Sequence, residues 1–235
     1  LQRLPAPAVR AEGEQLALFA EAPAAQKTPL SNIKYQIITT EAALNDLLRT
    51  LRAARLVAFD VETTSTNPML ADLVGIALAW GEGQAAYVPL GHEKAKQLPL
   101  GQTLAQIKPL LEETTIPKAA HNGEYNLTVL GRYGLAPQGE LFDIMIAEWL
   151  LDRASRNLGL KNLAFARLGA EMTPIRELIG KGKKQITMAQ VELSKAAPYG
   201  AADADMTWRL VGVLRPQLEA KGLMRLFEEV EMPLV

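Results

Sequence analysis

The chain has 235 residues, a formal net charge of −1, two histidines and no cysteine. Disulfides and thiolate metal sites are therefore excluded, a histidine-rich zinc site is not expected, and oxygen ligands would favour Mg²⁺ or Mn²⁺. There is no global basic field, so any contact with DNA must be local or bridged by metal ions. No apolar run approaches the roughly 18–20 residues that span a bilayer, and no signal peptide is evident, so a cytoplasmic protein without a membrane contact is predicted.

The first half of the chain predicts a linker followed by a strand-rich region. Residues 1–30 are rich in Ala, Pro, Glu and Gln without periodicity, which is typical of a linker. A short strand is expected over 35–38, followed by a helix that Thr40 caps. Three apolar runs predict further strands, at 56–59, 73–80 and 85–90. The Gly-Glu-Gly between the last two is a hairpin signal, so these strands favour an antiparallel meander.

The second half is predicted to be mainly helical. Helices are expected over 104–111, 123–133, 142–151, 160–168, 188–193 and 198–218, with a short strand at 118–120 and a loop at 180–184. The last helix should kink or end near Pro216. A meander followed by alternating helices and strands predicts an α/β fold with a mixed sheet flanked by helices.

Two pairs of side chains offer metal ligands. Asp60 and Glu62 come directly after the apolar run at 56–59 and, two apart in a strand, share one face, so both carboxylates can reach one cation. Tyr199 and Asp203 are four apart on a predicted helix and share a face as well. Taken alone, each pair favours a structural interpretation, namely solvated acids at a strand end and a packed tyrosine beside a surface acid. Asp205 points about 200° around the helix from Asp203 and is not expected to be a ligand.

A third polar segment, at 121–126, reads His-Asn-Gly-Glu-Tyr-Asn at a strand-to-helix junction, where a side chain such as Asn122 usually caps the helix. In this order, the three segments resemble the three exonuclease motifs of the DnaQ-like (ribonuclease H-like) superfamily. Within it they are similar to the proofreading 3′–5′ exonuclease domain of bacterial family A DNA polymerases, of the DNA polymerase I type. The similarity runs from about residue 35 to residue 235 and includes 86–89, 180–183 and 227–235.

The resemblance implies a ribonuclease H-like mixed sheet in a bacterial, cytoplasmic enzyme. It divides the chain into a linker at 1–30, an exonuclease-like domain at 31–222 and the start of the connection to the polymerase domain at 223–235. It also implies hydrolysis of the 3′-terminal phosphodiester of DNA with two metal ions, Mg²⁺ or Mn²⁺. Asp60, Glu62 and Asp203 would hold the first ion, Tyr199 would position the attacking water, and Asp60 would also touch the second ion.

This chain departs from the family pattern at Asn126, where the family has a metal-binding aspartate. An amide keeps an acceptor oxygen but loses the negative charge through which hard dications chiefly bind, so the second ion should bind weakly. Glu124, two positions back on the helix, faces away and does not replace it. We therefore expect the exonuclease activity to be reduced or absent. The alternative is a catalytically inactive scaffold or DNA-binding module of a polymerase; a free-standing nuclease is less favoured, because the end of the chain resembles the start of another domain.

The expected partner is the single-stranded 3′ end of a DNA primer–template. Three residues beside the carboxylates could line the pocket of the terminal nucleotide: Thr63, Thr64 and Asn122. Three lysines of one loop could contact phosphates, although a solvated loop is equally consistent: Lys181, Lys183 and Lys184. Ile175 falls where the family often places an apolar wedge, and a place in the core is equally plausible.

A short apolar island interrupts the linker at 15–19. Its side chains resemble the motif by which bacterial proteins dock on the replication sliding clamp, with the candidate residues Gln15, Leu16, Leu18 and Phe19. A flexible segment that presents two apolar side chains to a groove suits such docking. The alternative is that the island packs on the surface of the chain itself.

Overall fold

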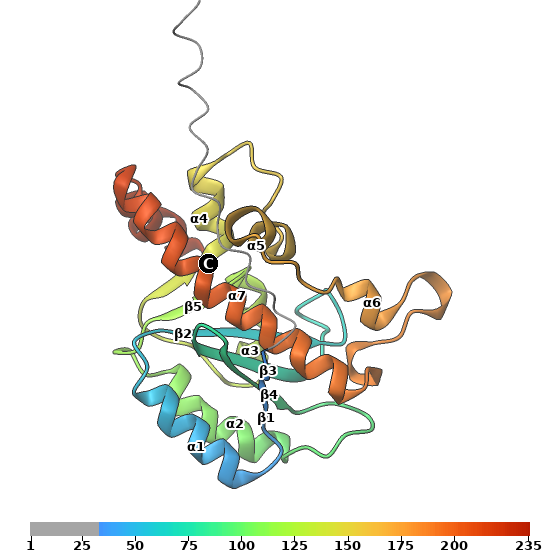
Figure 1. Ribbon diagram of the computed structural model, residues 1–235. Coiled ribbons are helices and arrows are strands. Elements are labelled where there is room, and N and C mark those ends of the chain that lie inside the picture. The colour runs from blue at the N-terminus through green and yellow to red at the C-terminus, as the bar shows by residue number, and fades with distance from the viewer. Residues whose placement is uncertain (1–32) are drawn as a thin grey trace, which may run out of the picture.

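A computed structural model describes residues 33–235, which form a six-stranded mixed sheet between two layers of helices (Figure 1). The strands lie in the order β1-β4-β3-β2-β5-β6. Their bounds are β1 Gln36–Ile37, β2 Val57–Thr63, β3 Leu73–Gly81, β4 Gln84–Pro89, β5 Lys118–Ala120 and β6 Leu141–Asp143. Consecutive strands β2, β3 and β4 pair antiparallel, whereas the pairs β1–β4, β2–β5 and β5–β6 are parallel. The predicted meander and mixed α/β sheet are confirmed.

The helices cover both faces of this sheet (Figure 1). One layer consists of α1 (Glu41–Arg52), α2 (Leu100–Leu111) and α3 (Gly123–Arg132), and the other of α4 (Ile144–Leu151), α5 (Leu160–Leu168) and α7 (Leu193–Ala220). Shorter helical turns follow: α6 (Ile175–Ile179), η3 (Gly182–Lys184), η4 (Met188–Gln190), α8 (Met224–Leu226), η5 (Phe227–Glu231) and η6 (Met232–Leu234). No helix within residues 33–235 is long and apolar enough to cross a membrane.

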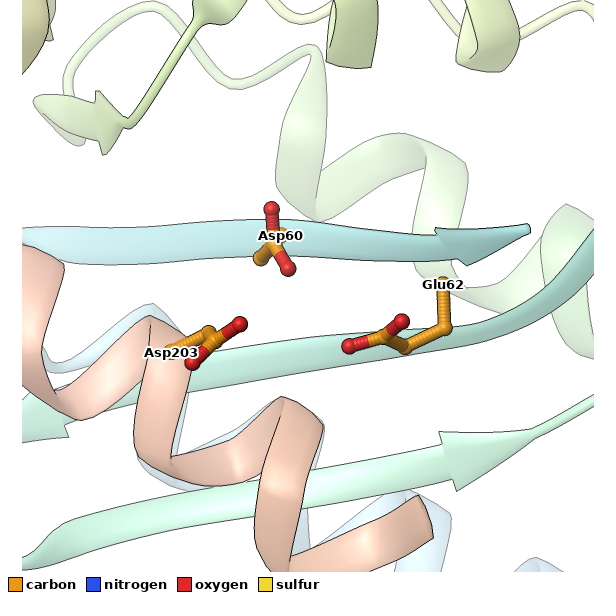
Figure 2. A group of neighbouring side chains, drawn as sticks. All are labelled: Asp60, Glu62 and Asp203. Atoms are coloured by element: carbon orange, nitrogen blue, oxygen red, sulfur yellow. The ribbon is translucent and has the colours of Figure 1, made fainter. Parts of the chain in front are cut away.

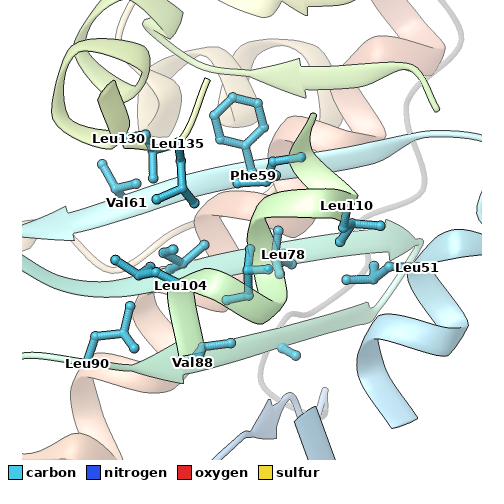
Figure 3. Packing of buried hydrophobic residues seen from close by; sticks show 14 of the residues in the cluster. Leu51, Phe59, Val61, Leu78, Val88, Leu90, Leu104, Leu110, Leu130 and Leu135 are labelled. Carbon is cyan, nitrogen blue, oxygen red and sulfur yellow. The ribbon is translucent and has the colours of Figure 1, made fainter. Parts of the chain in front are cut away.

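The core under α1, α2 and α3 follows from strand alternation. Phe59 and Val61 of β2 point into this layer and are 0% and 6% exposed, because successive strand residues face opposite sides of the sheet. Leucines at helical spacing meet them from α1 and α2 (Figure 3). The predicted cap of α1 is present, since the Thr40 side chain accepts a hydrogen bond from the amide of Ala43 at 3.3 Å.

The opposite face of the sheet is covered by α7, which lies close to β2, β3 and β4. Small residues make this approach possible, since a Cβ on Gly200 would lie 3.0 Å from the Tyr87 ring and 3.2 Å from Glu62 Oε1. Tyr87 is fully buried and also fills the space beside Gly75, where a Cβ would lie 2.1 Å from its hydroxyl oxygen. The two glycines and the tyrosine therefore set how closely α7 approaches the acidic side of β2.

Several predicted boundaries are wrong. The strand that begins at Val57 does not end before the acids but runs through them to Thr63, because Asp60 and Glu62 pair with Ala77 and Gly75 of β3. The segment at 142–151 is not one helix, since its first residues complete β6 and Asp143 then caps α4.

The last long helix does not end at Pro216. It starts earlier than predicted and continues to Ala220, with Pro198 and Pro216 inside it. Leu214 and Leu218, on either side of Pro216, are fully buried, so their packing outweighs the hydrogen bond that a proline removes. The predicted helix at 188–193 is one 3₁₀ turn, and α6 was not predicted at all.

Candidate metal centre

Three carboxylates converge between the sheet and α7. Asp60 and Glu62 lie on the same face of β2, and Asp203 faces them from α7, so the three acids turn toward one another (Figure 2). One oxygen of each lies within 4.8 Å of the others. Glu62 and Asp203 are both 7% exposed, so their carboxylates are largely withdrawn from water.

The donor set fits a hard divalent cation. Glu62 Oε1 is buried and has no hydrogen-bond partner among the described residues. A buried polar atom without a partner is costly, and native proteins almost always satisfy it. Carboxylate oxygens are the ligands that Mg²⁺ and Mn²⁺ prefer, so an ion between these side chains would satisfy the orphaned oxygen.

The electrostatics of the cluster also call for a cation. Burial, and then the charge of Asp203, raise the pKa of Asp60 to about 7. Burial, and then the charges of Asp60 and Asp203, raise the pKa of Glu62 well above its usual range. Burial raises the pKa of Asp203 too, against the opposing effect of Lys161. A cation between these acids would oppose these shifts and favour their charged forms.

Tyr199 lies beside this cluster, one turn before Asp203 on α7. Burial, and then the charge of Asp203, raise the pKa of its hydroxyl, so the phenol stays protonated and can donate a hydrogen bond. The separation of four residues on one helix thus places the two side chains together.

Lys161, from the first turn of α5, is a member of the site that sequence reasoning missed. Its ammonium forms an ion pair with Asp203 Oδ1 and lies 4.1 Å from the centre of the Tyr199 ring. No motif surrounds Lys161 in the sequence. It lies 42 residues before Asp203 and on another helix, so no local pattern could have predicted the contact.

Asn126 is buried at the edge of the cluster and is fully hydrogen-bonded. Its Oδ1 accepts from the amide of Val61 at 3.0 Å, and its Nδ2 donates to the carbonyl oxygens of His121 at 2.9 Å and Asn122 at 3.4 Å. The Asn126 side chain also lies close enough to Asp60 to lower the pKa of that carboxyl. The amide therefore lies against Asp60, and its two donor bonds are ones that a carboxylate could not make. Glu124 is exposed, as expected.

The predicted cap by the Asn122 side chain is wrong. Asn122 adopts a left-handed conformation, with φ 54°, and its side chain makes no capping bond. The amide of Gly123 donates instead to Asp143 Oδ2 at 2.6 Å, while Asp143 Oδ1 accepts from Met145 at 2.8 Å. One carboxylate from the end of β6 thus binds the starts of both α3 and α4, which removes the need for a local cap.

Two cavities adjoin the carboxylates. The first, about 690 Å³, touches Glu62. It includes four of the residues singled out from the sequence: Thr63, Thr64, Asn122 and Ile175. Ile175 is 40% exposed and is thus not a core residue. The lysines at 181, 183 and 184 are exposed and do not line this cavity.

The second cavity, about 620 Å³, touches Asp203, and Lys161, Lys195 and Tyr199 line it as well. Asp205, two residues beyond Asp203, points away from both cavities. Its carboxylate accepts hydrogen bonds from the Tyr35 hydroxyl at 2.8 Å and the Gly83 amide at 3.0 Å, and it pairs with Arg209, so its role is structural. The candidate clamp-binding residues Gln15, Leu16, Leu18 and Phe19 lie outside the described residues.

A mixed sheet of this order, with acids from its central strand facing an acid on the covering helix, defines the ribonuclease H-like class of exonuclease folds. Escherichia coli ribonuclease D, described as an exoribonuclease involved in structured RNA processing, shares this fold with a TM-score of 0.62 at 24% identity, over 80% of this chain and 46% of that one.

Residues 35–219 match the 3′–5′ exonuclease family of family A DNA polymerases, and the chain belongs to this family. It is 40% identical to DNA polymerase I of Chloroflexus aurantiacus over 99% of this chain and 25% of that protein. It is 36% identical to DNA polymerase I of Pseudomonas aeruginosa over 89% of this chain and 24% of that protein. The chain thus spans about a quarter of the length of these relatives.

Proposed function

We propose that this chain binds the single-stranded 3′ end of DNA and removes its terminal nucleotide as the proofreading domain of a polymerase, at a rate reduced by Asn126. The observation that carries the proposal is the convergence of Asp60, Glu62 and Asp203 around the partnerless Glu62 Oε1, in a chain of the 3′–5′ exonuclease family. By the same reasoning its partners are DNA and the polymerase domain of the same enzyme, into which residues 223–235 would lead.

The side chains of the site would have different roles in hydrolysis. Asp60, Glu62 and Asp203 would hold Mg²⁺ or Mn²⁺, which when bound lowers the pKa of a coordinated water and neutralises charge on the phosphate. Tyr199, kept protonated, orients the attacking water from the Asp203 side. In a two-metal arrangement, Asp60 would be shared between both ions.

Asn126 weakens this arrangement at the second ion. The amide lies against Asp60, where the family has an aspartate, and its oxygen is already engaged by the amide of Val61. Its nitrogen is engaged as well, by two carbonyl oxygens. A neutral ligand with its acceptor in use attracts a dication far less than a free carboxylate does. Even the loss of an outer-shell partner of a metal typically costs about 10–100-fold in activity, so a loss of at least this size is expected here.

The first cavity suits the terminal nucleotide of the strand. It adjoins Glu62 and combines polar walls with the exposed apolar side chain of Ile175, a combination that binds a sugar and stacks against a base. The exposed lysines at 181, 183 and 184 would contact the phosphates of the strand outside this cavity.

The segment at 15–19 is proposed to dock on a sliding clamp through Leu18 and Phe19. The proposal rests on the sequence alone. A peptide spanning residues 13–23 should bind a bacterial sliding clamp saturably, and the same peptide with both apolar residues replaced by alanine should not. Equal binding of the two peptides, or none by either, would contradict it.

The hydrolytic function is tested by degradation of a 5′-labelled single-stranded oligonucleotide with Mg²⁺ or Mn²⁺. The chain and its Asn126→Asp variant are compared, with Asn126→Asp/Asp203→Ala as the matched inactive control. Stepwise shortening from the 3′ end by Asn126→Asp, slow or absent in the parent and absent in the control, is expected. If Asn126→Asp is as inactive as the control, the catalytic proposal is wrong and the domain is a scaffold beside a polymerase.

A further inference from the structure

Lys161 brings a positive charge into direct contact with the carboxylate cluster. Its ammonium pairs with Asp203 Oδ1, and its side chain is 26% exposed against 10% for Asp203. Its charge also lowers the pKa of Asp60 and of Glu62, so it acts on all three acids. Its other contact is the face of the Tyr199 ring, which attracts a cation but forms no hydrogen bond with it. Both partners of the ammonium thus belong to the metal centre.

The formal charges of the site give this contact a consequence. Asp60, Glu62 and Asp203 carry three negative charges when ionised, and Lys161 carries one positive charge. Because Asn126 is neutral, the site is left with two negative charges, which a single dication balances. An ammonium that stays on Asp203 lowers the attraction of the cluster for such an ion, since like charges repel strongly at short range in a partly desolvated site.

The ammonium of Lys161 has room to move away from Asp203. It lines the cavity of about 620 Å³ on the Asp203 side, and a lysine carries its charge on a flexible four-carbon stem. Asp203 lines this cavity, whereas Glu62 lines the other cavity, which suits the terminal nucleotide. A strand whose scissile phosphate lies over the carboxylates would therefore bring a neighbouring phosphate to this side.

We propose that Lys161 is a built-in counter-ion that competes with the divalent cation for Asp203 and, once displaced, binds a phosphate of the DNA strand. The second half rests on the proposed function, whereas the competition for Asp203 does not. Lys161 would thus lower metal affinity while DNA is absent and raise DNA affinity once a metal is bound.

The competition is tested by titrating Mn²⁺ without DNA and following the free ion by electron paramagnetic resonance. Lys161→Met keeps most of the stem and removes the charge, and it should bind Mn²⁺ about tenfold more tightly than the parent, the equivalent of roughly 1.4 kcal/mol. Lys195→Met is the matched control, because Lys195 lines the same cavity but pairs with exposed Glu192 at 3.5 Å; its Mn²⁺ affinity should equal that of the parent. Equal or weaker binding by Lys161→Met would overturn the competition. Lys161→Gln serves in the same way if Lys161→Met does not fold.

The phosphate contact is tested by fluorescence anisotropy with a short single-stranded oligonucleotide whose 3′-terminal linkages are phosphorothioates, at saturating Mn²⁺. Lys161→Met should bind it at least threefold more weakly, and the slope of log affinity against log salt should fall by about 0.7, the value of one phosphate contact on a single strand. Lys161→Arg should restore the slope. A slope equal to that of the parent would overturn the contact. No binding of DNA by the parent would contradict the proposed function, and the Mn²⁺ titration would still decide the competition.

Discussion

Replacing Asn126 by aspartate should make the metal-free protein less stable than the parent, and a divalent cation should offset this loss. The amide donates to the carbonyl oxygens of His121 and Asn122, and a carboxylate loses both bonds and faces those oxygens with a negative charge. Two lost hydrogen bonds at about 1 kcal/mol each, with added repulsion from Asp60, cost about 2–3 kcal/mol. For a domain of this size that lowers Tm by about 5–10 °C.

A divalent cation should offset most of this difference. An ion present at about 100 times its Kd stabilises the fold by about 2.7 kcal/mol, and the carboxylate of the variant binds it more tightly than the amide does. The assay is thermal unfolding of parent and Asn126→Asp in EDTA and in MnCl₂. The control is Asn45→Asp, which adds the same charge at an exposed position of α1. Mn²⁺ should raise its Tm no more than it raises the Tm of the parent.

Two results would refute this reasoning. If Asn126→Asp has the Tm of the parent in EDTA, then the donor bonds of the amide do not stabilise the fold. If Mn²⁺ raises the Tm of both proteins equally, then position 126 does not contribute to metal binding, and the cause proposed for the reduced activity is wrong.

Three further changes test the geometry of the centre. Glu62→Gln should keep the stability of the metal-free fold, because Oε1 has no hydrogen bond to lose, but should lower Mn²⁺ affinity at least tenfold by calorimetry; a large loss of stability in EDTA would contradict this. Burial and the charge of Asp203 raise the pKa of Asp60 to about 7, so protons compete with the metal below that pH, and Mn²⁺ affinity should rise as pH increases from about 6 to 8; a flat profile would be inconsistent with it. Gly200→Ala should lower stability by about 1–3 kcal/mol in chemical denaturation, because its methyl group would press on Tyr87 and Glu62, whereas Gly212→Ala, in the same helix with open space around it, should not.

The sequence predicted what depends on short-range pattern. Because side chains alternate in a strand, the sequence predicts that the carboxylates of Asp60 and Glu62 face the same side. The separation of four residues between Tyr199 and Asp203 predicts that they share one face of a helix. Both expectations describe local geometry, which periodicity determines directly.

What the sequence did not predict depends on contacts between distant segments. Lys161 reaches Asp203 from another helix, and Asp143 replaces the local cap that was expected from Asn122. Likewise Pro216 reads as a helix end, and only the buried leucines around it keep the helix intact. In each case tertiary packing or a remote partner decides the outcome over local propensity.

The pleat of β2 also limits how this protein could have changed over time. Its residues alternate between the core, at Phe59 and Val61, and the metal centre, at Asp60 and Glu62. Gaining or losing one residue in this strand would turn the acids into the leucine layer and the core residues toward the carboxylate site, so the core and the candidate metal centre would be lost together. Single replacements escape this constraint. Under the proposed function, replacement of an aspartate by asparagine at position 126 would slow the chemistry while leaving every strand in register, so the fold could be inherited after the activity had declined.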